Sequence, residues 1–352
     1  MTARRAPCRP RRRPAADPFW TDLSTEDLLD LRLHELGLRI KGMVLESRIE
    51  SLNLELEKHG IRFRPHYWLS DEWFSPAGIP GIAIPFYLTH PRLMKLERRM
   101  MLEVEGASRS SCMRILRHEA GHALCHAYRL HRRRHWQRLF GPSSQPYPTM
   151  YRPRPLSKRY VHHLDSWYAQ SHPDEDFAET FAVWMTPSFS WRKHYKGWGA
   201  LKKLEYVHEL MAEIGPQSPE VRSRRQVDPV SRLRKTLRQH YEQRRTRYAI
   251  DEPDPDDKDL RRLFSDEPRH LHRDSAAAFL RSIRAEALEV VSSWSSQSGY
   301  MVEHSFREML TRCRSLDLRL RRGKERTKRD FMLLLAVKTM SAAHRGRLRL
   351  TL

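Results

Sequence analysis

One uninterrupted helix near the middle of the chain carries the most constraining pattern in the sequence. Residues 111–128 (SCMRILRHEAGHALCHAY) repeat apolar side chains at helical spacing without a proline. Residues four apart on a helix share a face, so His118 and His122 point the same way with Glu119 beside them. Two such imidazoles can bind one metal ion, and the carboxylate can act on a water molecule there. Gly121 leaves room for another element to pack closely.

A second predicted helix supplies carboxylates for the same site. Residues 171–187 (SHPDEDFAETFAVWMTP) begin with Ser171 as the expected N-cap, have acids in the first turn, and end at a proline. Glu175 and Glu179 are four apart and share a face with small alanines, which lets this helix pack against the first. Two acids on a packed face are costly to bury without a cation or hydrogen-bond donors. A zinc ion and the free N–H of a ligating histidine would satisfy both.

The two segments together resemble the gluzincin metallopeptidases, in which HExxH is followed by a glutamate on a second helix. The stretch EDFAETFA is similar to the active-site stretch of the anthrax lethal factor type. Residues 73–211 look like a group of bacterial zinc-binding metallopeptidases, and the stretches that carry this likeness are GIAIPFYL, RHEAGHA and WYAQSHPDEDFAE. The resemblance implies a Zn²⁺ ion held by His118, His122 and Glu175.

The same resemblance implies roles for the other residues. Glu179 would orient His118 or His122 by accepting a hydrogen bond from its ring. Tyr168 falls where lethal-factor-type enzymes keep a tyrosine that stabilises the oxyanion, although Tyr151 and Tyr160 are also nearby. Glu119 would accept a proton from the attacking water and deliver it to the leaving amine. The expected function is therefore a zinc-dependent peptidase that hydrolyses peptide bonds in a peptide or protein substrate.

Other ligand sets can be compared with the sequence. The metzincin pattern requires glycine and histidine where this chain has Cys125 and Tyr128, so that class is excluded. A histidine as third ligand, as in the DNA-associated SprT-like proteases, stays open, and the downstream candidates are His162, His163 and His172. We favour Glu175, because the acid pair has no better use and the histidines lack a comparable partner pattern.

Charge adds a second signal and a second class of partner. The chain has a formal net charge of +22, with arginine spread over the N-terminal tail and several later segments. Such a surface attracts nucleic acid or an acidic protein, yet no helix-turn-helix, zinc-finger or RNA-binding signature accompanies it. Two alternatives to the peptidase therefore remain: a nucleic-acid-binding, SprT-like protein, and a non-hydrolytic zinc-binding interaction protein. The intact Glu119 argues against the latter.

A short β-rich segment precedes the first helix. Residues 81–88 (GIAIPFYL) are rich in β-formers, and Pro85 would confine the strand to a sheet edge. Gluzincin-like enzymes place an edge strand beside the HExxH helix, where an extended substrate can add as a further strand. A packing strand with no substrate role is the alternative.

The predicted fold is α+β: a mainly helical zincin-like domain with a small sheet, followed by an all-α C-terminal region. We assign a basic disordered tail to residues 1–20, the metallopeptidase domain to 21–220 and the basic helical region to 221–352. Ser24 opens a leucine-rich helical stretch that runs to Gly60 with a break near Gly37. Further helices are expected at 90–105, 110–130, 172–186, 197–214 and 230–247, with a loop near the active site at 141–155 and an acidic linker at 251–257.

Composition favours the cytoplasm. No apolar run approaches the roughly eighteen residues of a membrane span, and no apolar stretch follows the basic N-terminus as in a signal peptide. The four cysteines form no C-x-x-C pair, which suits a reducing compartment and excludes a cysteine metal site.

Overall fold

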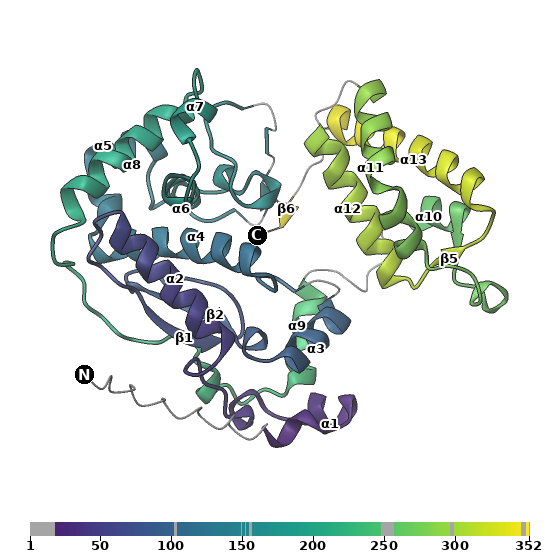
Figure 1. Cartoon of the computed structure of the whole chain (residues 1–352), viewed down its shortest axis with the longest axis horizontal. Coiled ribbons are helices and arrows are strands. Elements are labelled where there is room, and N and C mark those ends of the chain that lie inside the picture. Colours follow the sequence, from purple (N-terminus) through teal and green to yellow (C-terminus); the bar gives the residue numbers. More distant parts are fainter. Residues whose placement is uncertain are drawn as a thin grey trace, which may run out of the picture.

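The computed structural model describes residues 18–351 apart from 102–103, 149, 152, 155–156, 248–256, 296–298 and 346–349 (Figure 1). Helices dominate this part of the chain, and the strands are short, so the predicted mainly helical α+β class is confirmed. The predicted N-terminal tail lies almost wholly outside the described residues. So does the acidic linker, apart from its last residue.

The described chain folds into α-helices, short 3-10 helices and short strands. The α-helices are α1 (Thr25–Asp30), α2 (Val44–Lys58), α3 (Pro91–Met101), α4 (Arg109–Ala127), α5 (Arg134–Phe140), α6 (Pro173–Met185), α7 (Trp191–His194), α8 (Ala200–Ile214), α9 (Leu237–Arg247), α10 (Asp257–Leu263), α11 (Ala276–Ser295), α12 (Gly299–Ser315) and α13 (Lys324–Arg345). The 3-10 helices are η1 (Phe19–Thr21), η2 (Leu33–Leu36), η3 (Phe86–Thr89), η4 (Leu130–Arg132), η5 (Asp165–Gln170), η6 (Val230–Arg232) and η7 (Pro268–His270). The strands are β1 (His66–Ser70), β2 (Gly81–Pro85), β3 (Met150–Tyr151), β4 (Phe264–Ser265), β5 (Arg319–Leu320) and β6 (Leu350–Thr351).

The leucine-rich N-terminal stretch divides into α1, η2 and α2. Ser24 caps α1 as predicted, because its side-chain oxygen accepts a hydrogen bond from the backbone N–H of Asp27 at 3.1 Å. The expected break comes at Gly37, which follows η2 with a φ of 60°, a conformation that glycine adopts without strain.

Strands β1 and β2 form a parallel pair in the register His66↔Gly81 to Ser70↔Pro85. The register needs a glycine at 81, because a Cβ there would lie 2.3 Å from the imidazole of His66. The strand predicted over residues 81–88 is shorter in the structure. It ends at Pro85, and the 3-10 helix η3 follows it.

The other edge of β2 is also occupied. Ala83 exchanges backbone hydrogen bonds with Phe74, at 2.9 Å and 3.4 Å, and Pro85 has no N–H to offer. The expectation that this strand presents a free edge to an extended substrate is wrong, because the chain's own loop between β1 and β2 folds back onto that edge. Every residue of β2 is buried, as in a packing strand.

We call the described residues from 18 to 247 the first lobe. Its helices α2, α4, α6 and α8 pack in that order, so that α4 and α6 form its middle (Figure 1). A bidentate ion pair from Arg117 to Glu55, at 2.7 Å and 2.9 Å, ties α4 to α2. Apolar side chains of all four helices join one core, which extends from Trp20 to Tyr241. The core thus fixes the two helices that carry the predicted metal ligands.

The prediction of one helix over residues 230–247 is wrong in its first half. The segment is η6, an extended stretch, and then α9 from Leu237. The extended stretch accepts backbone hydrogen bonds from η2: the Leu33 N–H donates to the Lys235 carbonyl, and the His34 N–H donates to the Leu233 carbonyl. These long-range hydrogen bonds take the place of the intrahelical ones.

Helices α10 to α13, which we call the second lobe (residues 257–345), surround a second core, which includes Phe279, Phe306 and Phe331 (Figure 1). The first core reaches Tyr241, beyond the boundary near 220 that the sequence suggested. An ion pair of 2.9 Å from Arg307 on α12 to Asp165 in η5 links the two lobes. Among the helices described, none combines the length and apolar character that a membrane span requires.

Candidate metal centre

Close packing of α4 against α6 creates the site. Gly121 makes this packing possible, because a Cβ at that position would lie 2.9 Å from the Cα of Ala178, closer than atoms tolerate. Ser108 caps α4, and His172 caps α6 by accepting a hydrogen bond from the backbone N–H of Asp174. Ser171, the expected cap of α6, instead donates its hydroxyl to the Tyr168 carbonyl at 2.7 Å.

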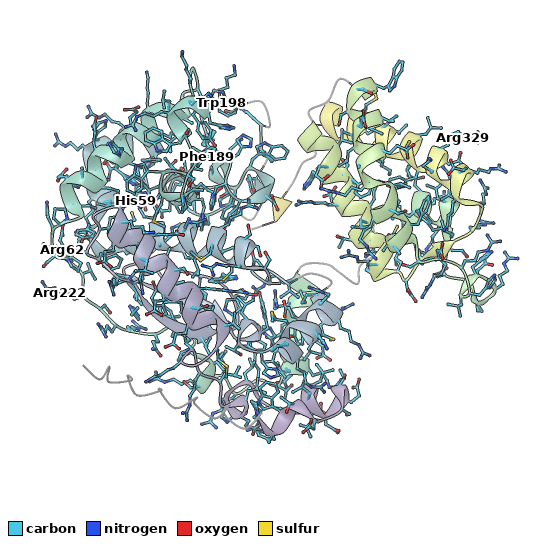
Figure 2. All side chains as sticks on the ribbon, in the orientation of Figure 1. His59, Arg62, Phe189, Trp198, Arg222 and Arg329 are labelled. Carbon is cyan, nitrogen blue, oxygen red and sulfur yellow. The ribbon has the colours of Figure 1, made fainter. Side chains whose placement is uncertain are left out.

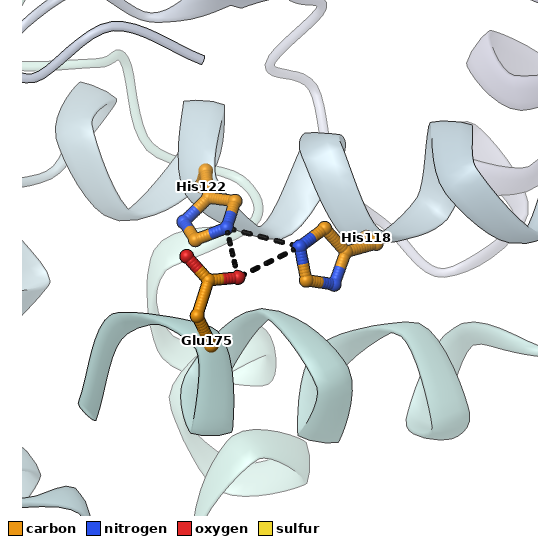
Figure 3. Close-up of side chains that lie close together, drawn as sticks. All are labelled: His118, His122 and Glu175. Atoms are coloured by element: carbon orange, nitrogen blue, oxygen red, sulfur yellow. Dashed lines mark hydrogen bonds and ion pairs between the residues drawn. The ribbon is translucent and has the colours of Figure 1, made fainter. Parts of the chain in front are cut away.

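Three side-chain donor atoms converge between the two helices (Figure 3). The Nε2 atoms of His118 and His122 lie 3.1 Å apart, and Oε2 of Glu175 lies 3.0 Å from the first and 3.1 Å from the second. All three residues have little exposure to solvent. Within the described part of the chain, these are the residues that could together hold a metal ion.

The donor set fits zinc. Two imidazole nitrogens and one carboxylate oxygen form a common catalytic zinc set that leaves a fourth position open. Metal–ligand distances of about 2.0–2.1 Å would place tetrahedral donors about 3.3 Å apart, close to the observed separations.

Glu179 lies behind the three donors. Its Oε1 accepts a hydrogen bond from Nδ1 of His118 at 2.9 Å, and its Oε2 accepts one from the backbone N–H of Leu164 at 2.8 Å. The bond from Nδ1 leaves the lone pair of Nε2 directed at the site when the ring is neutral. The structure therefore connects Glu179 to His118 rather than to His122.

Electrostatics couple the three donors tightly. Burial by itself lowers the pKa of His118, but its hydrogen bonds to Glu175 and Glu179 outweigh burial and raise that pKa well above its ordinary value. Burial likewise raises the pKa of Glu175, whereas the two histidines, His122 first, lower it well below the ordinary value. Zinc binding requires a neutral imidazole, so the ion would have to displace a proton from this pair.

Glu119 is buried beside the donors and is poorly satisfied. Its Oε2 has no hydrogen-bond partner among the described residues, and burial raises the pKa of its carboxyl group. Its backbone carbonyl accepts a hydrogen bond from Ser75 Oγ at 3.2 Å, which brings the loop between β1 and β2 to the edge of the site. A buried carboxylate oxygen without a protein partner, next to a possible metal site, is suited to bind a water molecule.

Tyr168 reaches the centre as well. Its ring lies 5.6 Å from that of His118, centroid to centroid. Burial, with the charges of Glu175 and Glu119, raises the pKa of Tyr168 well above its ordinary value, so its hydroxyl keeps its proton and can donate it. Of the other tyrosines considered, Tyr151 is buried in β3 and its hydroxyl contributes to the raised pKa of Tyr168, whereas the ring of Tyr160 lies 4.4 Å from the Lys203 ammonium group.

Tyr147 contacts the donor residue Glu175, and the sequence did not predict this contact. Its hydroxyl donates to Oε1 of Glu175 at 2.9 Å, and its ring stacks on His172 at 3.8 Å. This hydrogen bond places part of the loop 141–155 beside the donor residues, as the sequence predicted. A tyrosine in a proline-rich loop carries no periodic signal, so only the tertiary structure could identify it.

The three histidines considered as third ligands do not reach the donors. Nε2 of His163 donates to the Arg114 carbonyl at 2.9 Å, and that of His172 donates to the Gln145 carbonyl at 2.9 Å. The ring of His162 packs edge-on to Trp198 at 5.9 Å. Among the residues that the structure describes, the carboxylate of Glu175 is the group that completes the set with His118 and His122.

The comparison with protein families agrees with this geometry. Residues 98–188 match a family described as "putative zinc-binding metallo-peptidase". The matched segment contains α4 and α6, and therefore all three donor residues. No curated protein and no solved structure matches the chain.

Proposed function

We propose that the chain is a zinc-dependent peptidase of the gluzincin kind, in which His118, His122 and Glu175 hold the metal. The observation that carries this proposal is the pairing of three converging donor atoms with the buried Glu119 carboxyl group, whose Oε2 has no partner among the described residues. A purely structural zinc site closes its coordination with four protein ligands and needs no free base. This site offers three donors and a base.

The chain's own residues provide the remaining parts of peptide hydrolysis. Zinc held by this donor set would supply Lewis acidity, which polarises a carbonyl group and lowers the pKa of water. Glu119 accepts the proton of the attacking water and passes it to the leaving amine nitrogen, for which its raised pKa is suited. Tyr168 donates its hydroxyl to the carbonyl oxygen as negative charge develops there.

Two side chains hold the donors in place. Glu179 accepts from His118 on the side away from the site, and Tyr147 donates to the second oxygen of Glu175. Both contacts orient a ligand without occupying the open side of the centre.

The compartment proposed is the cytoplasm. The described cysteines, Cys112, Cys125 and Cys313, are buried and free of disulfides, as expected for a protein of a reducing environment. The presence of Glu119, buried next to the donor residues, argues against the non-hydrolytic alternative.

The decisive experiment measures metal and turnover on the same preparations. We expect one zinc ion per chain by mass spectrometry, lost in Glu175→Ala, and cleavage of a peptide library by the zinc-loaded wild type. Glu119→Gln should keep the zinc and lower kcat by about 10²–10⁴-fold, because only the proton acceptor is removed.

Glu209→Gln serves as the matched control. Glu209 is exposed on α8, and the same chemical change there should leave both readouts unchanged. Full turnover by Glu119→Gln, or a wild type that binds no zinc, would sink the proposal.

A further inference from the structure

An extended segment crosses the surface behind the β1–β2 pair. We call residues 219–229 the strap, because they form no helix or strand yet have fixed backbone contacts. The strap starts beside the end of α4, where the Val221 N–H donates to the Ala127 carbonyl at 2.9 Å. It ends at Pro229, where η6 begins.

Alternate side chains of β1 hold the strap by its carbonyls. His66 Nε2 donates to the Arg225 carbonyl at 3.0 Å, and Trp68 Nε1 donates to that of Val227 at 2.9 Å. Ser70 Oγ donates to the Asp228 carbonyl at 2.7 Å. Residues two apart on a strand point to the same face, so one face of β1 fixes the strap backbone at three places.

The strap arginines are left facing solvent. Arg222, Arg224 and Arg225 are exposed, and none forms an ion pair with a described residue. The acid that precedes them, Glu220, lies 3.9 Å from Arg129 instead. Figure 2 shows Arg62 and Arg222 pointing outward along the same edge of the view.

A hollow of about 540 Å³ opens where the strap turns into η6. Three arginines line it, Arg224, Arg225 and Arg232, together with a single carboxylate, Asp228. Neither Arg232 nor Asp228 forms an ion pair with a residue of the described part. The hollow is therefore a concave, net cationic surface whose charges are not neutralised from within.

Several arginines elsewhere in this lobe are neutralised within the fold. Arg117 pairs with Glu55, Arg238 pairs with Asp30, and Arg244 pairs with Glu97 at 2.7 Å. Holding a row of unpaired guanidinium groups together costs electrostatic free energy, which an anionic ligand would recover. Exposed cations without ion-pair partners also occur elsewhere in this lobe, as on α3, but the strap arginines differ from them because β1 fixes the backbone that carries them and a hollow opens beside them.

We propose that the strap and its hollow bind the phosphate backbone of nucleic acid. Guanidinium groups match phosphate oxygens in pairs, and several phosphates in a row suit several arginines in a row. A lipid surface fits less well, because no exposed large apolar residue lies between 219 and 235 to enter it. No aromatic ring is exposed there for stacking on bases, so binding should depend little on sequence.

The test compares two triple variants of the full chain, with equal loss of charge. One is Arg222→Gln/Arg224→Gln/Arg225→Gln in the strap. The control is Lys95→Gln/Arg98→Gln/Arg99→Gln on the exposed face of α3, where the same number of cations also lacks ion-pair partners among the described residues. Fluorescence anisotropy with a labelled single-stranded oligonucleotide and its duplex, over a series of salt concentrations, gives the affinity and its salt dependence.

We expect the strap variant to bind the oligonucleotide about 10–100-fold more weakly than the wild type at low salt. The slope of log Kd against log salt concentration should be smaller by about two units than that of the wild type. The α3 variant should stay within about threefold of the wild type. Equal weakening in both variants would overturn the proposal, since net charge alone would then explain binding. Tighter binding of polyglutamate than of either oligonucleotide, lost in the strap variant, would overturn it in favour of an acidic protein.

Zinc content and peptide cleavage, measured on the same samples, keep this inference separate from the proposed function. The strap is held by the side chains of β1 and not by the three donor residues or Glu119, so both readouts should be unchanged in the strap variant. A wild type that binds no zinc would contradict the peptidase proposal, but it would not affect the conclusion on nucleic-acid binding.

Discussion

Two tyrosine hydroxyls beside the metal centre have different surroundings, and a matched pair of substitutions separates their roles. Tyr147 hydrogen-bonds the ligand Glu175, whereas Tyr168 packs against His118. Tyr147→Phe should weaken zinc binding by about tenfold, because Glu175 loses an orienting donor. Tyr168→Phe should leave zinc affinity unchanged and lower kcat by about 10²–10³-fold, because the lost donor acts on the reacting carbonyl. Competition with a chromophoric chelator and steady-state kinetics measure the two effects.

The opposite pattern would exchange the two assignments. A fall in kcat for Tyr147→Phe at full zinc occupancy, with normal kinetics for Tyr168→Phe, would make Tyr147 the residue that contacts the substrate.

Glu179 also acts through a neighbour. Its two oxygens accept from His118 Nδ1 and from the Leu164 N–H. An amide has one acceptor oxygen, so Glu179→Gln must place an N–H₂ group against one of these donors. We expect zinc affinity to fall about 10–100-fold while the chain stays folded. Unchanged affinity in the chelator assay, relative to Glu209→Gln, would show that the hydrogen bond to His118 does not matter for the metal.

Packing of α4 against α6 depends on the absence of a single methyl group. A Cβ at Gly121 would lie 2.9 Å from the backbone of Ala178 and 3.2 Å from the ring of Phe181. Alanine raises helix propensity by about 1 kcal/mol, but overpacking costs about 1–3 kcal/mol. We expect Gly121→Ala to be destabilising by about 1 kcal/mol net and to weaken zinc binding, since α6 carries Glu175.

Denaturant unfolding measures the first effect and the chelator assay the second. Ser110→Ala, an exposed change in the first turn of α4, is the control for a substitution on the same helix that leaves its packing against α6 untouched. A Gly121→Ala protein as stable as Ser110→Ala would show that the two helices can separate without cost.

The loop between β1 and β2 decides how a substrate can approach. Phe74 occupies the free edge of β2 at Ala83, and Ser75 reaches the carbonyl of Glu119. An extended peptide therefore cannot pair with β2 at this point. Through the Ser75 side chain, this loop contacts the residue that we propose as the base.

Stability of the whole chain should depend on pH through a buried histidine of α9. His240 is almost fully buried, neither ring nitrogen has a hydrogen-bond partner among the described residues, and its ring lies 5.4 Å from that of Phe86. Burial first, then the cations Arg244 and Lys235, lower the pKa of His240 to about 3, against the partial opposition of Asp71.

The sign of the pH effect follows from this lowered pKa. An unfolded histidine has a pKa of about 6.5, so below that pH the unfolded chain binds a proton that the folded chain rejects. The contribution to stability is complete above pH 6.5 and is lost as the pH falls toward 3, by about 2 kcal/mol at pH 5. Thermal unfolding at neutral pH and at pH 5 should show a smaller loss in His240→Leu than in the wild type. An equal loss in both proteins would contradict the prediction.

Local periodicity, together with the family resemblance, indicated the candidate metal centre from the sequence. The four-residue spacing of His118 and His122, and that of Glu175 and Glu179, places each pair on one face of a helix whatever the rest of the chain does. Gly121 and Ala178 indicated that the two faces could pack closely, which the structure confirms. The main helices lie within a few residues of their predicted bounds for the same reason, since caps and prolines are local signals.

Contacts between residues distant in sequence decided the rest. Tyr147 reaches Glu175 through an irregular loop, Phe74 closes the edge of β2, and backbone hydrogen bonds with η2 keep residues 233–236 extended. The arginines of the strap become a surface only because β1 fixes their backbone. Each of these depends on hydrogen bonds across long stretches of chain, whose free energy a helical or strand pattern does not encode.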